Sequence, residues 1–193
     1  MTRARNTFVP MLLEAGGPLL FPDPTQADAR GLVAVGGDLG IDRLRLGYAN
    51  GIFPWFDDED PPLWWSPDPR CILPLDDLHV PRSLVRRMAK RDYEISWNEA
   101  FVDVMRCCAE KRSDGTWITE QMIEAYTALH ELGHAHSIEV WMGDRLVGGL
   151  YGVQIGGLFA AESKFHRETD MSKIAFVHAV RDLREAGTTL FDV

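Results

Sequence analysis

Apolar positions from about residue 71 onward recur with the periods of regular secondary structure. Spacings of three or four residues predict amphipathic helices, and strict alternation between residues 136 and 142 predicts a half-buried strand. In chain order we expect a helix over 82–90, a short strand over 93–96, helices capped by Asn98 and Thr119, strands over 136–142, 145–155 and 158–165, a helix over 171–186 capped by Asp170, and a strand over 189–193. Helices followed by a three-stranded meander, a helix and a strand indicate an α+β fold.

The first 70 residues have a different pattern, because glycine and proline recur throughout them. One short helix fits this region, over residues 41–50, with Gly51 placed to end it. We therefore expect a small loop-rich domain over 1–70 and a larger domain over 71–193.

Composition and charge narrow the possible partners. The chain has 193 residues, of which 46% are hydrophobic and 25% charged, as in globular proteins. Its 20 basic and 29 acidic residues give a net charge of −9, so a polyanionic partner would have to be held by a local basic patch. Three cysteines without a CxxC pair argue against a disulfide framework and favour a reducing, cytosolic setting. Neither a bilayer-spanning run nor a signal peptide is expected.

A run of five cations is the local basic patch that the sequence offers. Arg82, Arg86, Arg87, Lys90 and Arg91 follow one another with no acidic residue between them. The spacing of residues 82, 86 and 90 places three of them on one helical stripe. A single-signed stripe in an acidic protein indicates phosphate binding, although a solvated helix face has the same pattern.

Two strands carry carboxylates at positions that are costly to bury. Alternation places Glu162 and Lys164 together on one face of the strand over 158–165. If that face is exposed, an ion pair between them would explain both residues without any functional role. Asp192 lies in the last strand, and two carboxylates on neighbouring strands could accept a proton or bind a cation. Glycines 148, 149 and 152 indicate a bulge or a close approach by another backbone or a ligand.

Residues 130–134 read H-E-L-G-H, which has the H-E-x-x-H spacing of zinc proteases. Glu162 could supply a third ligand. However, Gly133 is expected to end the helix, so His134 would lie beyond it and lose the i,i+4 geometry. A zinc-dependent hydrolase acting through His130 and His134 is therefore kept as the alternative.

Several longer motifs taken together resemble the leucyl/phenylalanyl-tRNA–protein transferase family. They are GLVAVGGDL (31–39), GIFPWF (51–56), WWSPDPR (64–70), HVPRSL (79–84), GTWI (115–118), LHELGHAHS (129–137) and VGGLYG (147–152). The resemblance runs from about residue 20 to 193. It also explains the H-E-x-x-H spacing as a family motif with no metal role.

The resemblance implies a GNAT-type acyltransferase fold, an antiparallel-rich mixed sheet with helices, for the larger domain. It implies transfer of Leu or Phe from aminoacyl-tRNA to the α-amino group of proteins with N-terminal Arg or Lys, which creates a bacterial degradation signal. The aminoacyl ester is already activated, so no cofactor or metal is needed and positioning can supply most of the catalysis. We expect a monomeric, cytosolic enzyme.

Residue roles are implied by the same resemblance. Asp192 matches the catalytic aspartate, which would take the proton of the amine, and Glu162 matches a glutamate that would orient the acceptor. The residues expected around the aminoacyl-adenosine and its side chain are Trp55, Trp117, Leu150, Phe159, Lys164 and Leu183. The basic run, Arg82, Arg86, Arg87, Lys90 and Arg91, would hold the tRNA acceptor stem through its backbone.

The chain departs from the family pattern at two places. Lys164 stands where the family usually has Met, and it could pair with Glu162, narrow the pocket or alter its preference. The family motif continues beyond Asp192 to a glutamine and a further segment, whereas this sequence ends at Val193. We therefore expect weak activity and lower stability, and a third reading is an inactive relic that binds tRNA or peptide.

Overall fold

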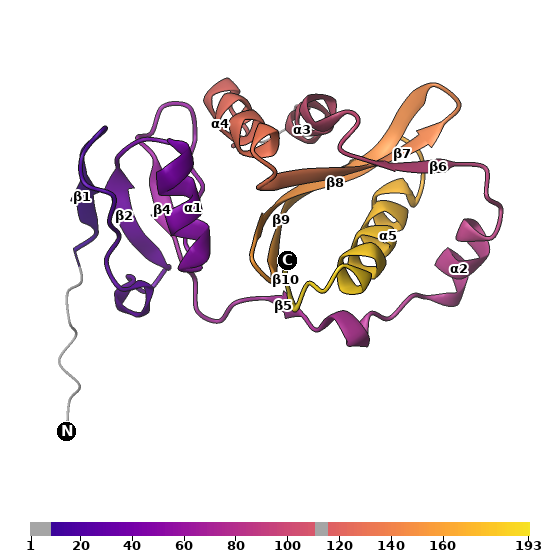
Figure 1. Ribbon diagram of the computed structural model, residues 1–193, viewed down its shortest axis with the longest axis horizontal. Coiled ribbons are helices and arrows are strands. Elements are labelled where there is room, and N and C mark those ends of the chain that lie inside the picture. The colour runs from indigo at the N-terminus through magenta and orange to yellow at the C-terminus, as the bar shows by residue number, and fades with distance from the viewer. Residues whose placement is uncertain (1–8, 111–115) are drawn as a thin grey trace. The chain divides into compact units, whose positions relative to one another are not determined.

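The structure is a computed structural model, which describes residues 9–110 and 116–193 (Figure 1). The chain divides into two compact units, Met1–Arg70 and Cys71–Val193. In the described ranges, no helix combines the length and the apolar character that crossing a membrane requires.

Residues 9–70 of the first unit form a four-stranded sheet and one α-helix. The strands are β1 (Met11–Leu13), β2 (Leu32–Gly36), β3 (Phe53–Pro54) and β4 (Leu63–Trp65), in the order β1-β2-β4-β3, with β1 parallel to β2 and the other pairs antiparallel. Helix α1 (Ile41–Ala49) ends as predicted before Gly51, whose φ is +72°. The Trp64 indole is fully buried and donates to the Gly36 carbonyl oxygen over 2.9 Å, which ties β4 to the end of β2.

The second unit is built on a six-stranded sheet in the order β5-β10-β9-β8-β7-β6. Its elements are β5 (Ile72–Leu73), α2 (Arg82–Met88), β6 (Glu94–Trp97), α3 (Phe101–Ala109), α4 (Glu120–Glu131), β7 (Ala135–Met142), β8 (Arg145–Ile155), β9 (Leu158–His166), α5 (Met171–Glu185) and β10 (Leu190–Asp192). Among the strand pairs of the described residues in this sheet, β9–β10 is parallel and the others are antiparallel. Helix α5 packs on one face of this sheet and α3 and α4 on the other (Figure 1). The predicted α+β class is confirmed.

The long elements follow the pattern of the sequence, and the short ones depart from it at their ends. Strand β8 has the predicted bounds, and the Thr119 side chain accepts a hydrogen bond from the Met122 backbone as the predicted cap of α4. Asn98 does not cap α3: it has a left-handed backbone, and its side-chain oxygen accepts from the Ser137 N–H over 3.1 Å. Asp170 is also left-handed and makes no side-chain cap bond to α5. Asp170 therefore holds the predicted N-cap position of α5 without a side-chain cap bond, whereas Asn98 does not cap α3.

Position 152 of β8 requires glycine, because the neighbouring strand β9 leaves no room for a side chain there. A Cβ there would collide with the Ala160 carbonyl oxygen and lie 2.6 Å from the Phe159 ring. The register between β8 and β9 also shifts between Tyr151 and Gly152. The expected bulge and close backbone approach are therefore both confirmed.

We expect Gly152→Ala to lower the free energy of unfolding by about 3 kcal/mol, because the added methyl group meets backbone that cannot move aside. Gly156→Ala is the matched control: that glycine has φ +56° with no atom near its missing Cβ. It should cost only about 1 kcal/mol of left-handed strain. Urea unfolding followed by circular dichroism measures both, and equal costs for the two variants would contradict the packing argument.

Candidate active site

Strand β9 carries a β-bulge at Glu162, and this irregularity sets the geometry of the candidate site. Gly152 of β8 pairs with Ala161, whereas the preceding residue, Tyr151, pairs with Ser163. Glu162 is therefore an extra residue, and Glu162 and Ser163 together stand opposite Tyr151. Beyond the bulge, the alternation of side chains between the two faces is shifted by one position.

The bulge makes one sequence prediction wrong, because Glu162 and Lys164 do not share a face. Lys164 pairs with Leu150, which belongs to the core beneath α5. Glu162 instead stands at the bulge opposite Tyr151, whose ring contacts Phe101 of α3 and Tyr126 of α4. Burial raises the pKa of Tyr151, and the charge of Glu162 raises it further. Glu162 thus belongs to the side of the sheet that α3 and α4 cover.

Asp192 points to the same side of the sheet as Glu162. Strand β10 runs parallel to β9, with Phe191 opposite Phe159 and Asp192 opposite Ala160. The two phenylalanines belong to the core beneath α5. Successive side chains of a strand point to opposite faces, so Asp192 is directed away from α5. Asp192 is 8% exposed, and Glu162 is half-buried. The bulge and the parallel pairing therefore bring two carboxylates of neighbouring strands to one face.

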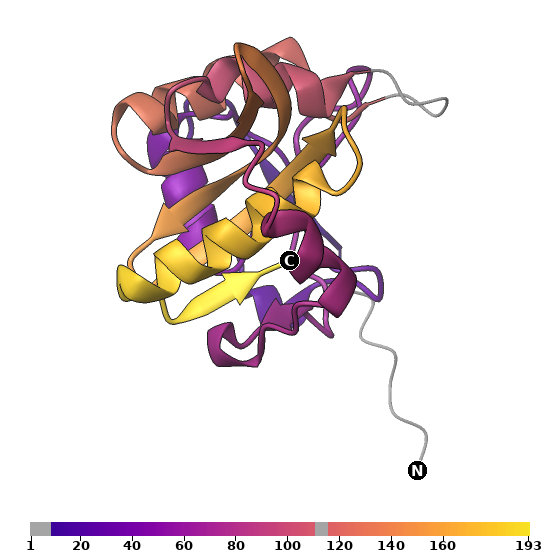
Figure 2. The same ribbon diagram turned by 90° about the vertical axis from the view of Figure 1, so that its right-hand side faces the viewer.

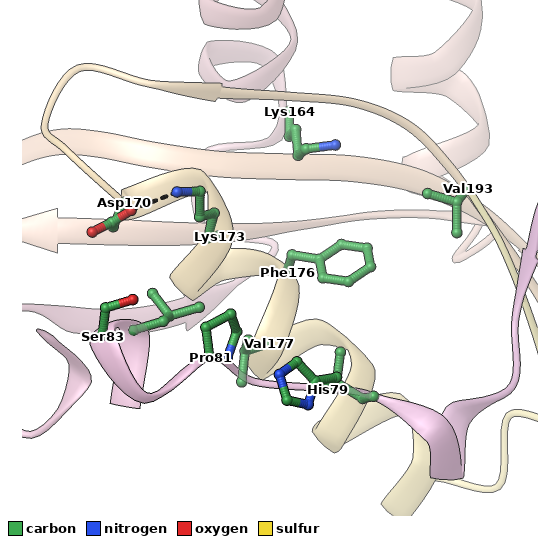
Figure 3. Close-up of a pocket in the computed structure, with 11 residues that line it drawn as sticks. His79, Pro81, Ser83, Lys164, Asp170, Lys173, Phe176, Val177 and Val193 are labelled. Carbon is green, nitrogen blue, oxygen red and sulfur yellow. Dashed lines mark hydrogen bonds and ion pairs between the residues drawn. The ribbon is translucent and has the colours of Figure 1, made fainter. Parts of the chain in front are cut away.

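A cavity of about 320 Å³ lies on the α5 side of the sheet, between β9, α5 and residues 78–84 (Figure 3). Its walls are largely apolar and include Phe176 and Val177. Lys173 pairs with Asp170 over 2.8 Å at one end of the cavity, as Figure 3 shows. The Lys164 Nζ atom lies 5.9 Å from the centroid of the Phe176 ring. The cavity therefore offers an apolar surface with an ammonium group beside it.

The residues expected to line an aminoacyl pocket are distributed over several places. Lys164 lines the cavity, whereas Leu150, Phe159 and Leu183 are buried together in the core beneath α5. Trp117 is half-buried just before α4. Trp55 belongs to the first unit and is 51% exposed, with its ring 6.0 Å from that of Trp65.

The basic run forms a shorter helix than the sequence predicted. Helix α2 ends at Met88, so Lys90 and Arg91 lie beyond it. The prediction that three cations form a stripe on one helix is therefore wrong. Arg87 pairs with Asp92 over 2.5 Å. Arg82 and Arg86 are exposed on the helix, and Lys90 and Arg91 are exposed after it. The cations are therefore accessible, but they lie on the short helix α2 and on the residues after it, which we call its tail, rather than along one continuous helix.

Sequence reasoning missed a further cation, Arg181, which α5 adds to this surface. Helix α2 packs beside α5 (Figure 2). Tyr93, which follows the basic run, contacts His178 of α5, with its hydroxyl 3.5 Å from Nε2. Burial raises the pKa of Tyr93, while the positive charges of Arg87, Arg181 and Arg91 act to lower it. Arg181 is distant in sequence from the run, so only the packing of α2 on α5 reveals it.

The H-E-x-x-H segment does not present two histidines on one helix face. Helix α4 ends at Glu131, and Gly133 has φ +74°, so His134 follows the helix. His130 stacks on Phe101, with ring centroids 4.3 Å apart and planes 2° from parallel, and its Nδ1 lies 2.9 Å from the Ala135 oxygen. No group of three or more potential metal ligands occurs among the residues that the structure describes. His130 therefore has a structural role in packing against Phe101.

Glu139 is a buried carboxylate that sequence reasoning did not single out. It is fully buried in β7 and accepts hydrogen bonds from the hydroxyls of Ser96 at 2.6 Å and Ser137 at 2.5 Å. The Trp141 indole donates to Ser96 over 2.8 Å. The sequence feature that could have indicated this buried carboxylate is its position between Ile138 and Val140 in an otherwise apolar strand. Its partners join β6 to β7.

We expect His130→Ala to destabilise the fold by about 2 kcal/mol, because it removes an aromatic stack and a partner of a backbone carbonyl. His134→Ala is the control and should cost less than about 1 kcal/mol, since its side chain follows the helix end. Thermal or urea unfolding with and without added Zn²⁺ checks this. Stabilisation by zinc that either substitution abolishes would instead favour the metal reading.

Comparisons with known proteins agree with this architecture. Residues 72–193 match the family model described as leucyl/phenylalanyl-tRNA protein transferase, and residues 37–68 match the model of its N-terminal domain. A leucyl/phenylalanyl-tRNA–protein transferase of Anaeromyxobacter sp. (strain K) is 55% identical over 175 residues, which cover 89% of this chain and 75% of that relative. Its counterpart in Nitratidesulfovibrio vulgaris (strain DP4) is 52% identical over 176 residues, covering 90% and 75%.

Solved structures give a weaker likeness. The structure of L-PGS from Bacillus licheniformis matches 83% of this chain and 51% of its own chain, with 12% identity and a TM-score of 0.45, which does not establish a shared fold. The family models and the two relatives do establish the family: the chain belongs to the leucyl/phenylalanyl-tRNA protein transferases.

Proposed function

We propose that this chain transfers leucine or phenylalanine from aminoacyl-tRNA to the α-amino group of proteins that begin with Arg or Lys. Its family makes it an aminoacyltransferase that acts between tRNA and protein. The observation that carries the residue-level proposal is the pair of acids, Glu162 and Asp192, on one face of the sheet. We further propose a GNAT-type fold for Cys71–Val193, and a monomer that acts in the cytosol, where its three cysteines stay free.

The chemistry requires little beyond positioning and one proton acceptor. The neutral acceptor amine attacks the carbonyl carbon of the aminoacyl ester, so that a C–N bond forms and the bond to the 3′ oxygen of the terminal ribose breaks. The nitrogen loses one proton and the departing oxygen gains one. Asp192 is our candidate for carrying that proton, because general bases act within hydrogen-bond reach of the group they deprotonate. Glu162 is our candidate for orienting the amine.

We assign the transferred side chain to the cavity beside Lys164 and Phe176. This cavity is on the opposite face of the sheet from Glu162 and Asp192, so we place the ester where the pairing of β9 and β10 ends, after Ala160 and Asp192, next to Val193, which lines the cavity. Its apolar walls suit leucine or phenylalanine, and shape must supply the selectivity, because one methylene group is worth only about 1–3 kcal/mol in such a pocket. The opposite faces of Lys164 and Glu162 argue against an ion pair between them as the reason for lysine at this position. No observation in the described part of the chain favours a zinc hydrolase.

We assign the RNA to the surface of Arg82, Arg86, Lys90, Arg91 and Arg181. These side chains are exposed and come from α2, its tail and the adjoining helix α5. Such contacts bind phosphates without reading sequence. The net charge of −9 makes a local patch of this kind necessary for any RNA complex.

We expect the chain to move leucine from Leu-tRNA to a peptide with N-terminal Arg, and to leave the same peptide untouched when its α-amine is acetylated. Asp192→Asn should lower kcat by about 100-fold or more, because a general base contributes that much. The Kd for tRNA should stay within about twofold, since the charge removed faces the reaction rather than the RNA surface. Radiolabel transfer and filter binding measure the two quantities. A loss of tRNA affinity at unchanged kcat would refute the role of Asp192.

We expect Arg86→Gln and Arg181→Gln each to weaken tRNA binding about eightfold at 0.1 M salt, which is the cost of one lost phosphate contact at a salt slope of 0.9. Arg184→Gln, one turn further along α5, is the matched control. Arg184 pairs with Asp76 over 3.6 Å, so its loss should change affinity less than about twofold. Fluorescence anisotropy over a salt series measures these affinities. Equal effects of the three substitutions would show that only the net charge of the chain matters, which would contradict the assigned surface.

A further inference from the structure

The hydroxyl of Tyr151 is buried without a hydrogen-bond partner. The side chain is 0% exposed at the centre of β8, and its oxygen is one of three unpartnered buried side-chain atoms among the described residues. The others are the Arg43 Nε atom in the first unit and the Thr188 hydroxyl before β10. Buried polar groups are normally bonded, because burial removes their water, so each exception needs an explanation.

The register of β8 and β9 places this hydroxyl beside the candidate site. Glu162 and Ser163 both stand opposite Tyr151 at the bulge. The Tyr151 ring meets Phe101 and Tyr126 edge to face, with centroids 6.0 Å away in each case. The ring is therefore fixed between α3 and α4, and its hydroxyl is held in one place.

The hydroxyl is a donor that stays protonated. Burial raises the pKa of Tyr151 well above its ordinary value, and the charge of Glu162 raises it further. A phenol that keeps its proton can donate to a carboxylate but cannot act as a base. Because no part of the side chain is exposed, it cannot touch a substrate either.

We propose that Tyr151 is a positioning residue, whose hydroxyl donates to the Glu162 carboxylate once the acceptor amine is bound. The inference rests on the proposed function, in which Glu162 orients that amine. Hydrogen bonds of active sites are often incomplete without substrate and tighten in the complex. The bulge places Glu162 beside Tyr151, so a hydroxyl fixed there would help to set the orientation of the carboxylate.

Tyr151→Phe tests this proposal, because it removes only the hydroxyl and keeps the ring contacts. We expect the KM for the acceptor peptide to rise about tenfold, which corresponds to the loss of one hydrogen bond to a charged group. The KM for Leu-tRNA should not change. In a Glu162→Gln background the same substitution should have no further effect, since the two residues act as one unit.

Thr188→Val is the matched control, because it removes another unpartnered buried hydroxyl of the same unit. It should raise stability and leave both KM values unchanged. If Tyr151→Phe behaves in the same way, or if its effect adds fully to that of Glu162→Gln, the proposal is wrong. Incorporation of 3-fluorotyrosine at position 151 keeps the donor, so the peptide KM should stay within about twofold of the unaltered chain.

The outcomes also separate this inference from the proposed function. Transfer by the unaltered chain with an unchanged peptide KM in Tyr151→Phe would overturn the inference alone. Transfer with an unchanged peptide KM in Glu162→Gln would overturn the orienting role of Glu162 and this inference with it. An absence of any transfer by the unaltered chain would overturn the proposed function itself.

Discussion

The extra residue in β9 is the constraint on which the rest of the site depends. Without it, Glu162 would pair directly with Tyr151 and every residue after it would change faces. Lys164 would then leave the α5 side, where it lines the cavity beside Phe176. The bulge thus separates an acidic face beneath α3 and α4 from an apolar cavity beneath α5. Gly152 permits this arrangement, because β9 passes where any larger residue of β8 would project a side chain.

Electrostatics are organised locally in a chain that is acidic as a whole. The exposed cations of α2 and its tail are continued by Arg181, while Arg87 and Arg184 are engaged by Asp92 and Asp76. Ion pairs of this exposed kind add little stability. They do place a negative charge beside Arg87 and Arg184, which lowers the positive potential at those two positions. The surface that we assign to RNA is therefore selected by neighbouring acids as much as by the positions of the arginines.

The sequence predicted the long elements well, because their signals are redundant. Strand β8 lies between two glycine turns and alternates along its length, and α4 begins at a threonine whose side chain caps it. Short-range signals failed where tertiary contacts decide the backbone. Asn98 is held by Ser137 of a distant strand, and the positive charges after Met88 gave no indication that α2 ends there. The glycines of β8 indicated a bulge, but the residue that bulges lies on the other strand and carries no mark of its own. Arg181 and the buried Glu139 are likewise defined by packing.

The position of β10 has a consequence for biosynthesis. This strand lies between β9 and β5, so it pairs with the first strand of the second unit as well as with the last strand of the meander. Asp192 takes its place only when those three strands have come together. During translation the meander and its helices can pack while residues 190–192 are still inside the ribosome, since domains fold as the chain emerges. The acid that we assign to proton transfer is therefore added to an already shaped sheet.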